Sequence, residues 1–122
     1  MAGGTYISHE DVEKWLGETL DGSSVPTDSH VDNLSVFAEG LAATWSYPTS
    51  LSTLNGRDSG ALTTILVEIV INMLRDWDVW KKGGGTTAGE GFTYRAPRGY
   101  EDLKQALLNM CRGDFANIKM ID

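Results

Sequence analysis

The sequence predicts a mostly α-helical fold, a small bundle of about four helices in one domain that spans residues 1–122. Two observations on the residues lead to this prediction. Apolar residues recur at spacings of three and four along much of the chain, and helix start and stop signals flank these stretches. A third observation is size: 122 residues with 41% hydrophobic side chains suffice for one core but not for separate cofactor and substrate domains.

The first helix is predicted to begin after Ser8, within "HEDVEKWLG". The Ser8 hydroxyl can accept the backbone N–H of Asp11, and acidic residues in the first turn favour the positive end of the helix dipole. Gly17 or Gly22 can end this short helix, and loop residues follow it.

A second helix is predicted from about Asp28 to Ser46, with Pro48 as its stop. The stretch "TSLSTLNGRDS" that follows reads as a polar connection, in which Asn55-Gly56 marks a tight turn. The apolar face expected on the second helix consists of Val31, Leu34, Phe37, Ala38, Leu41, Ala42 and Trp45.

The third and longest helix is predicted at about 60–82, with Ser59 as its cap. It is apolar over most of its circumference, and a narrow polar strip recurs every fourth residue at Thr64, Glu68, Asn72 and Asp76. Such a helix is usually surrounded, either by its own fold or by a neighbouring subunit. The predicted subunit interface consists of Val67, Ile71 and Leu74.

The last third of the chain begins with a glycine-rich stretch. Residues 83–98 are predicted to form a flexible loop or a short β-hairpin around "FTYRA". A fourth helix is expected at about 99–112, with Cys111 on its apolar face as a small core residue. The C-terminal segment 114–122 is too apolar for a solvated tail and is predicted to add a strand or to dock on a partner.

The glycine-rich stretch lacks the residues of a nucleotide site. In "GGTTAGEG", Glu90 stands where a P-loop requires lysine, and its carboxylate would repel phosphate. The dinucleotide pattern fails as well, because Ala88 replaces its last glycine. His9, His30 and Cys111 show no metal-ligand spacing. We therefore expect no cofactor, no metal and no catalytic residues.

The charge distribution disfavours nucleic-acid binding. Residues 1–58 hold nine acidic residues against Lys14 and Arg57, which accounts for the whole net charge of −7, whereas residues 59–122 hold eight of each sign. Nucleic-acid affinity depends on lysine and arginine neutralising phosphates. The single cysteine, the lack of a signal peptide and the absence of a long apolar run predict a soluble intracellular protein with no membrane contact.

Aromatic and basic residues gather around the end of the third helix, the glycine-rich stretch and the tail. This composition is favoured at protein interfaces. The residues expected to contact a partner are Trp77, Trp80, Lys81, Lys82, Phe92, Tyr94, Arg95, Arg98, Phe115, Ile118 and Met120.

Four features together resemble the small head-to-tail connector, or adaptor, proteins of tailed viruses. They are the opening "ISHEDVEKWLG", a second helix leading into "ATWSYPTSL", a long apolar helix, and "APRGYEDLKQALLNMC". The resemblance implies a homo-oligomeric ring of helical subunits in the virion neck. The ring docks on the portal protein, links capsid to tail, and surrounds a channel through which DNA passes without specific binding.

Other function classes stay open on the residues alone. The runner-up is a small intracellular helical module for protein–protein interaction or regulation. An enzyme with a scattered active site is a third class, and a DNA-reading helix-turn-helix is disfavoured because no basic recognition helix is present.

Overall fold

The computed structural model describes residues 3–24, 26–81 and 97–112, with the backbone alone for 78–81. These residues form five helices and no strand, so the prediction of a mostly helical fold is confirmed. The helices are α1 (His9–Leu16), α2 (Asp28–Ser46), α3 (Leu51–Arg57), α4 (Ser59–Lys81) and α6 (Tyr100–Arg112). Most of the predicted loop or hairpin at 83–98, and the whole of the tail 114–122, fall outside the described residues.

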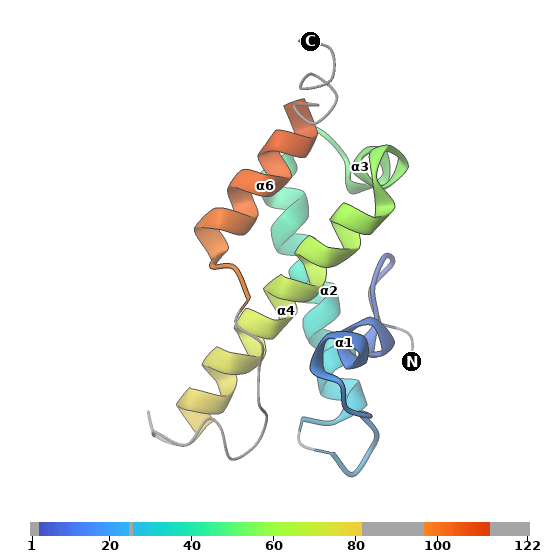
Figure 1. Cartoon of the computed structure of the whole chain (residues 1–122), viewed down its shortest axis with the longest axis vertical. Coiled ribbons are helices and arrows are strands. Elements are labelled where there is room, and N and C mark those ends of the chain that lie inside the picture. Colours follow the sequence, from blue (N-terminus) through green and yellow to red (C-terminus); the bar gives the residue numbers. More distant parts are fainter. Residues whose placement is uncertain (1–2, 25, 82–96, 113–122) are drawn as a thin grey trace.

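The long helices α2 and α4 lie side by side and antiparallel, and form the centre of the molecule (Figure 1). Helix α4 contacts each of the other four helices. Helix α1 and the connection to α2 lie at one end, and α3 with the C-terminal end of α6 lies at the other. The largest fully buried apolar side chains come mainly from α3, α4 and α6: Leu54, Leu62, Leu66, Ile69, Ile71, Leu74, Leu103 and Leu107.

All four predicted helices begin and end within one residue of a limit that the sequence set, with Gly17 rather than Gly22 ending the first. The second spans Asp28–Ser46 as predicted, and the third and fourth differ by one residue at their starts or ends. Ser8 caps α1 in a capping box, as expected. At α4 the cap is different: the Asp58 carboxylate accepts the Ala61 N–H at 3.0 Å, and Ser59 is already helical.

The fifth helix, α3, corrects the prediction of a polar connection with a turn at Asn55-Gly56. The hydroxyl of Ser50 caps this helix by accepting the Thr53 N–H at 3.1 Å, while Leu51 and Leu54 enter the core. Burial of these two side chains stabilises a segment whose intrinsic helix propensity is low, because tertiary packing overrides propensity. The Arg57 guanidinium then donates to the carbonyls of Met110 and Cys111 at 2.6 and 2.8 Å and caps the last turn of α6.

Helix α1 ends at Gly17, which has a φ of 74°. An L-residue with a side chain is strained in this left-handed region by roughly 1–2 kcal/mol. We expect Gly17→Ala to lower the free energy of unfolding by about 1 kcal/mol, measured by urea denaturation. Gly22 in the following connection does not have a positive φ, so Gly22→Ala is the matched control and should leave stability unchanged. Equal effects of the two substitutions would contradict the assignment of Gly17 as the helix end.

The predicted apolar face of α2 is turned to the core except at Phe37, and its members Leu34, Leu41 and Trp45 are partly buried against that core. Val31, Ala38 and Ala42 are buried as expected, but Phe37 is 66% exposed. The buried side of α2 also includes Asp32, Ser35, Glu39 and Ser46. The N-terminal segment supplies hydrogen-bond donors for Asp32 and Glu39, which sequence periodicity does not reveal. The hydroxyls of Ser35 and Ser46 are satisfied by backbone carbonyls three or four residues away.

Candidate functional site

The predicted partner-contact residues lie mostly outside the described part of the chain. Lys82, Phe92, Tyr94, Arg95, Phe115, Ile118 and Met120 are not described, and Trp80 and Lys81 are described by their backbone in α4 alone. Two of the set have described side chains. Trp77 is partly buried and meets the ring of His30 edge-on, with centroids 4.7 Å apart. Arg98 is bound within the chain.

Arg98 fastens the start of the last segment to α4 through Glu68. The Arg98 Nη2 and Nε atoms donate to Glu68 Oε2 at 2.7 and 3.1 Å, and the Arg98 backbone N–H donates to Oε1 at 2.8 Å. The Glu68 side chain is 5% exposed and that of Arg98 is 44% exposed. Hydrogen bonding to Glu68 raises the pKa of Arg98, so the guanidinium stays charged. Arg98 is thus an intramolecular clamp, and its contact with a partner stays a prediction.

Asn72 completes this attachment from the next turn of α4. Its amide donates to the Arg98 carbonyl at 2.8 Å and to the Glu68 carbonyl at 2.9 Å, and its Oδ1 atom accepts from Arg75. The polar strip predicted on the long helix is therefore buried at its middle two positions, while Thr64 and Asp76 are exposed. Nearby, partial burial raises the pKa of the Tyr100 phenol, and the charge of Asp76 adds to this increase.

The residues predicted as a subunit interface are part of the internal core. Val67 is 4% exposed, and Ile71 and Leu74 are fully buried. Helix α4 is apolar almost all round because the other four helices surround it within one chain. This corrects the interface prediction, since side chains already covered by their own fold are not available to a neighbour.

The N-terminal segment is attached to α2 by two buried carboxylates. Glu39 accepts the backbone N–H groups of Thr5, Tyr6 and Ile7 at 2.7, 2.6 and 2.9 Å. Two turns earlier on the same side of α2, Asp32 accepts the His9 N–H at 2.8 Å and contacts the His9 ring at 3.0 Å. Gly4 lies against Glu39 so closely that an added Cβ would overlap the carboxylate. These two acids account for part of the acidic first half and are structural.

The His9–Asp32 pair predicts a pH effect. The hydrogen bond to Asp32 raises the pKa of His9 above 6.5. A group whose pKa is higher in the folded state stabilises the fold fully below its unfolded pKa, and this contribution is lost as pH rises through the folded pKa. We expect NMR titration to place the pKa of His9 above 6.5, and Asp32→Asn to lower it. His9→Gln should reduce stability more below pH 6.5 than well above it. A His9 pKa at or below the ordinary value would contradict the pairing.

The exposed residues of α2 form a surface without charge. The charged residues of α2 are Asp28, Asp32 and Glu39, of which the last two are buried and the first lies partly buried in the first turn. The surface, here called the α2 outer face, consists of Asn33, Val36, Phe37, Gly40, Ala43, Thr44 and the adjoining Tyr47. Phe37 is 66%, Tyr47 83% and Val36 46% exposed.

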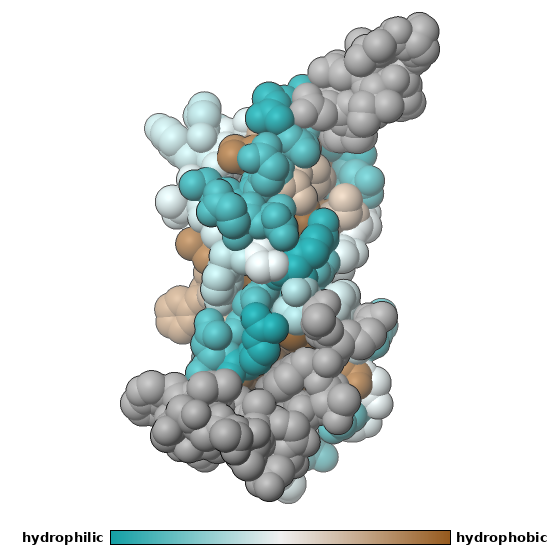
Figure 2. Space-filling view, turned by 60° about the vertical axis from the view of Figure 1, so that its left-hand side comes forward, coloured by the Kyte–Doolittle hydropathy of each residue, from teal (hydrophilic) through white to brown (hydrophobic). Residues whose placement is uncertain are grey.

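Other helices expose a different kind of surface. The exposed residues of α1, Glu10 and Lys14, are both charged, and α6 exposes Glu101, Asp102 and Arg112 together with Tyr100 and Gln105. The side of the molecule that carries α6 is accordingly mainly hydrophilic (Figure 2). Depletion of charge together with exposed aromatic residues is typical of the centre of a protein interface. Sequence periodicity placed Phe37 in the core and so missed this surface. The signal that could have found it is the absence of charged residues between Glu39 and Arg57.

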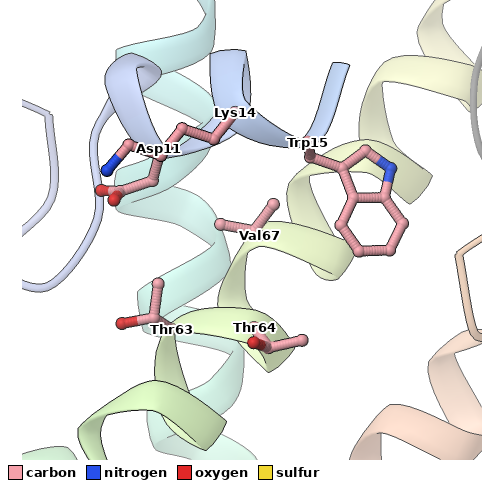
Figure 3. Close-up of a pocket in the computed structure, with 6 residues that line it drawn as sticks. All are labelled: Asp11, Lys14, Trp15, Thr63, Thr64 and Val67. Carbon is pink, nitrogen blue, oxygen red and sulfur yellow. The ribbon is translucent and has the colours of Figure 1, made fainter. Parts of the chain in front are cut away.

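A cleft of about 360 Å³ lies between α1 and α4. Figure 3 shows the Val67 side chain on α4 between Asp11 and Trp15 of α1. Lys14 of α1 lies above it, and Thr63 and Thr64 lie on the preceding turn of α4. The Asp11 carboxylate accepts the Ser8 N–H at 3.0 Å as part of the helix cap. The Asp11 carboxylate therefore has a structural role at this cleft.

In the described ranges, no three His, Cys, Asp or Glu side chains are grouped so that they could hold a metal ion. None of the helices within these ranges is long and apolar enough to cross a membrane. Comparison of the chain with protein-family models, curated proteins and solved structures gave no significant match.

Proposed function

We propose that the chain is a structural head-to-tail connector subunit of a tailed virus, which joins other copies and a portal in the virion neck. The observation that carries the proposal is the α2 outer face. It presents Phe37 and Tyr47 to solvent with no charged neighbour on the helix. Exposed aromatic side chains without charged neighbours are typical of surfaces that a protein partner covers.

The distribution of acidic side chains supports a channel role. Besides the two buried carboxylates on α2, acidic residues are exposed on α1 and on the connection that follows it, at Glu10, Glu18 and Asp21. These elements lie at the end of the molecule opposite α3 (Figure 1). In a ring, this end lines the passage, where negative charge lets DNA move without adhering.

The test uses the full-length chain and portal particles from the same virus. We expect negative-stain images and mass measurement to show portal particles decorated by a ring of the wild-type protein. Phe37→Glu should abolish decoration and give virus particles whose heads lack tails. Gln105→Glu, on the exposed side of α6, is the matched control and should assemble normally.

The outcomes separate the alternatives. Absence of binding by the wild-type protein to its portal would exclude the connector function and leave the intracellular interaction module. Normal decoration by Phe37→Glu would keep the connector function but show that the α2 outer face is not the contact. Genes for portal and capsid proteins beside the coding sequence would add support.

A further inference from the structure

Gly40, at the centre of the α2 outer face, is not explained by the fold of a single chain. It is exposed in the middle of a 19-residue helix, and a Cβ added there would meet nothing within 4 Å. Glycine inside a helix costs about 0.5–1 kcal/mol relative to alanine. A glycine is useful here if a second backbone approaches closely, since the smallest residue at a crossing allows the shortest distance between helix axes.

We propose that the α2 outer face pairs with the same face of a second copy of this chain, with the two α2 helices antiparallel and crossing at Gly40. In such a two-fold contact, residues equally far before and after Gly40 face each other. Phe37 then meets Ala43, Val36 meets Thr44, and Asn33 meets Tyr47. The large Phe37 side chain faces the small Ala43, Val36 faces Thr44 of nearly equal size, and the polar groups of Asn33 and Tyr47 face each other at the edge.

The chemistry of each pair fits burial. No charge has to be desolvated, because the face contains none. The Thr44 hydroxyl already donates to the Gly40 carbonyl at 3.0 Å, so this side chain can turn its methyl group to the partner without leaving its hydroxyl unsatisfied. The Tyr47 hydroxyl and the Asn33 amide lie at the rim, where they can bond to each other or to water.

A parallel arrangement is less favourable. It would bring Phe37 against Phe37 and Ala43 against Ala43, which places large side chains together and leaves a gap beside the small ones. The described acidic surface of α1 from a second copy is also a poor partner for the α2 outer face, because its charges would be desolvated against an uncharged helix. The sequence of α2 is therefore most complementary to itself in the antiparallel direction.

In the free protein, the contact between two α2 helices shields Phe37 from water until an assembly partner covers it. A single pair of helices buries less than the roughly 1,200 Å² found at the low end of stable interfaces, so the dimer is weak and depends on concentration. The inference goes beyond the connector function and does not require it, since the self-pairing follows from the residues of α2 alone.

The first test is sedimentation velocity of the full-length chain over a wide range of concentration. We expect a reversible monomer–dimer equilibrium. Gly40→Glu should weaken association by roughly a hundredfold or more, because it places two like charges at the crossing. The chain should remain helical by circular dichroism, since the added side chain meets no neighbour within 4 Å. Gln105→Glu adds the same charge on α6 and should dimerise as the wild type does. A wild-type protein that stays monomeric at every concentration overturns the proposal.

The second test reads the register with cysteines. A mixture of Phe37→Cys and Ala43→Cys chains should form a mixed disulfide, identified by intact mass, faster than either variant forms a disulfide with itself. The wild-type chain, which contains Cys111 alone, measures the background. Self-coupling of Phe37→Cys that is as fast as mixed coupling would overturn the antiparallel crossing at Gly40, because it would bring residue 37 against residue 37.

Discussion

Glu68→Ala is expected to lower the free energy of unfolding by about 2–3 kcal/mol. The substitution removes a carboxylate that is 5% exposed and that binds Arg98 through both its backbone and its guanidinium. Breaking a buried ion pair usually costs about 3–5 kcal/mol, because one charge is left without a partner. The loss here is smaller because Arg98 is 44% exposed and its guanidinium can turn to water.

Urea denaturation followed by circular dichroism measures this effect. Gln105→Ala is the matched control, since it truncates an exposed polar side chain in the middle of a helix and should change stability by about 0.5 kcal/mol or less. Arg98→Ala should cost at least as much as Glu68→Ala, because the carboxylate left behind is the more deeply buried of the two groups. If Glu68→Ala had no more effect than the control, the clamp between α4 and the segment before α6 would not contribute to stability.

Glu39→Ala is expected to have an effect of similar size, about 2–4 kcal/mol, together with local release of the N-terminal segment. Three backbone N–H groups lose their acceptor at once. Detachment of the N-terminal segment limits the loss of unfolding free energy, because the freed N–H groups can bond to water. Detachment also exposes the apolar side chain of Ile7 to water, which is unfavourable, since Ile7 is only 2% exposed in the intact fold. Amide hydrogen exchange of Thr5, Tyr6 and Ile7 should accelerate strongly.

Two variants make the Glu39 prediction specific. Gly4→Ala should loosen the same segment while keeping the carboxylate, because the new Cβ overlaps it. Glu18→Ala removes an exposed acid from the connection after α1 and should leave exchange at residues 5–7 unchanged. Protection of these amides in the Glu39→Ala variant would show that Glu39 is not the group that holds the segment.

Both predictions concern polar residues that the helical pattern misassigned or did not explain. Glu68 and Asn72 recur every fourth residue with exposed Thr64 and Asp76, so the pattern does not distinguish the two buried members of the strip from the two exposed ones. Asp32 and Glu39 likewise resemble ordinary acids of a helix surface. Their burial depends on backbone groups distant in the chain: residue 98 lies 30 positions from Glu68, and residues 5–7 lie 32–34 positions from Glu39. No local period contains that information.

The helices themselves were largely predictable because their signals are local. Capping residues, apolar spacing and terminal glycine act within a few positions of each helix end, and they place α1, α2, α4 and α6 correctly to within one residue where the prediction set a limit. Helix α3 was missed because its stability comes from Leu51 and Leu54 entering the core, which outweighs the turn propensity of Asn55-Gly56.

The candidate functional surface depends on how α2 is turned. Periodicity places the apolar residues of α2 against the core except Phe37, and distant partners decide which acidic residues are buried beside them. The carboxylates of Asp32 and Glu39 bind the N-terminal segment, and this keeps their side of α2 inward and leaves Phe37 outside.

The sequence by itself determined that the described chain is mostly helical, where four of its helices lie, and that its charge is concentrated in the first half. The tertiary structure alone decided that Val67, Ile71 and Leu74 are internal, that Arg98 is a clamp, and that the uncharged face of α2 is outward. The physical reason is that helix formation follows from neighbouring residues, whereas burial of a polar group follows from whichever distant donor or acceptor can satisfy it.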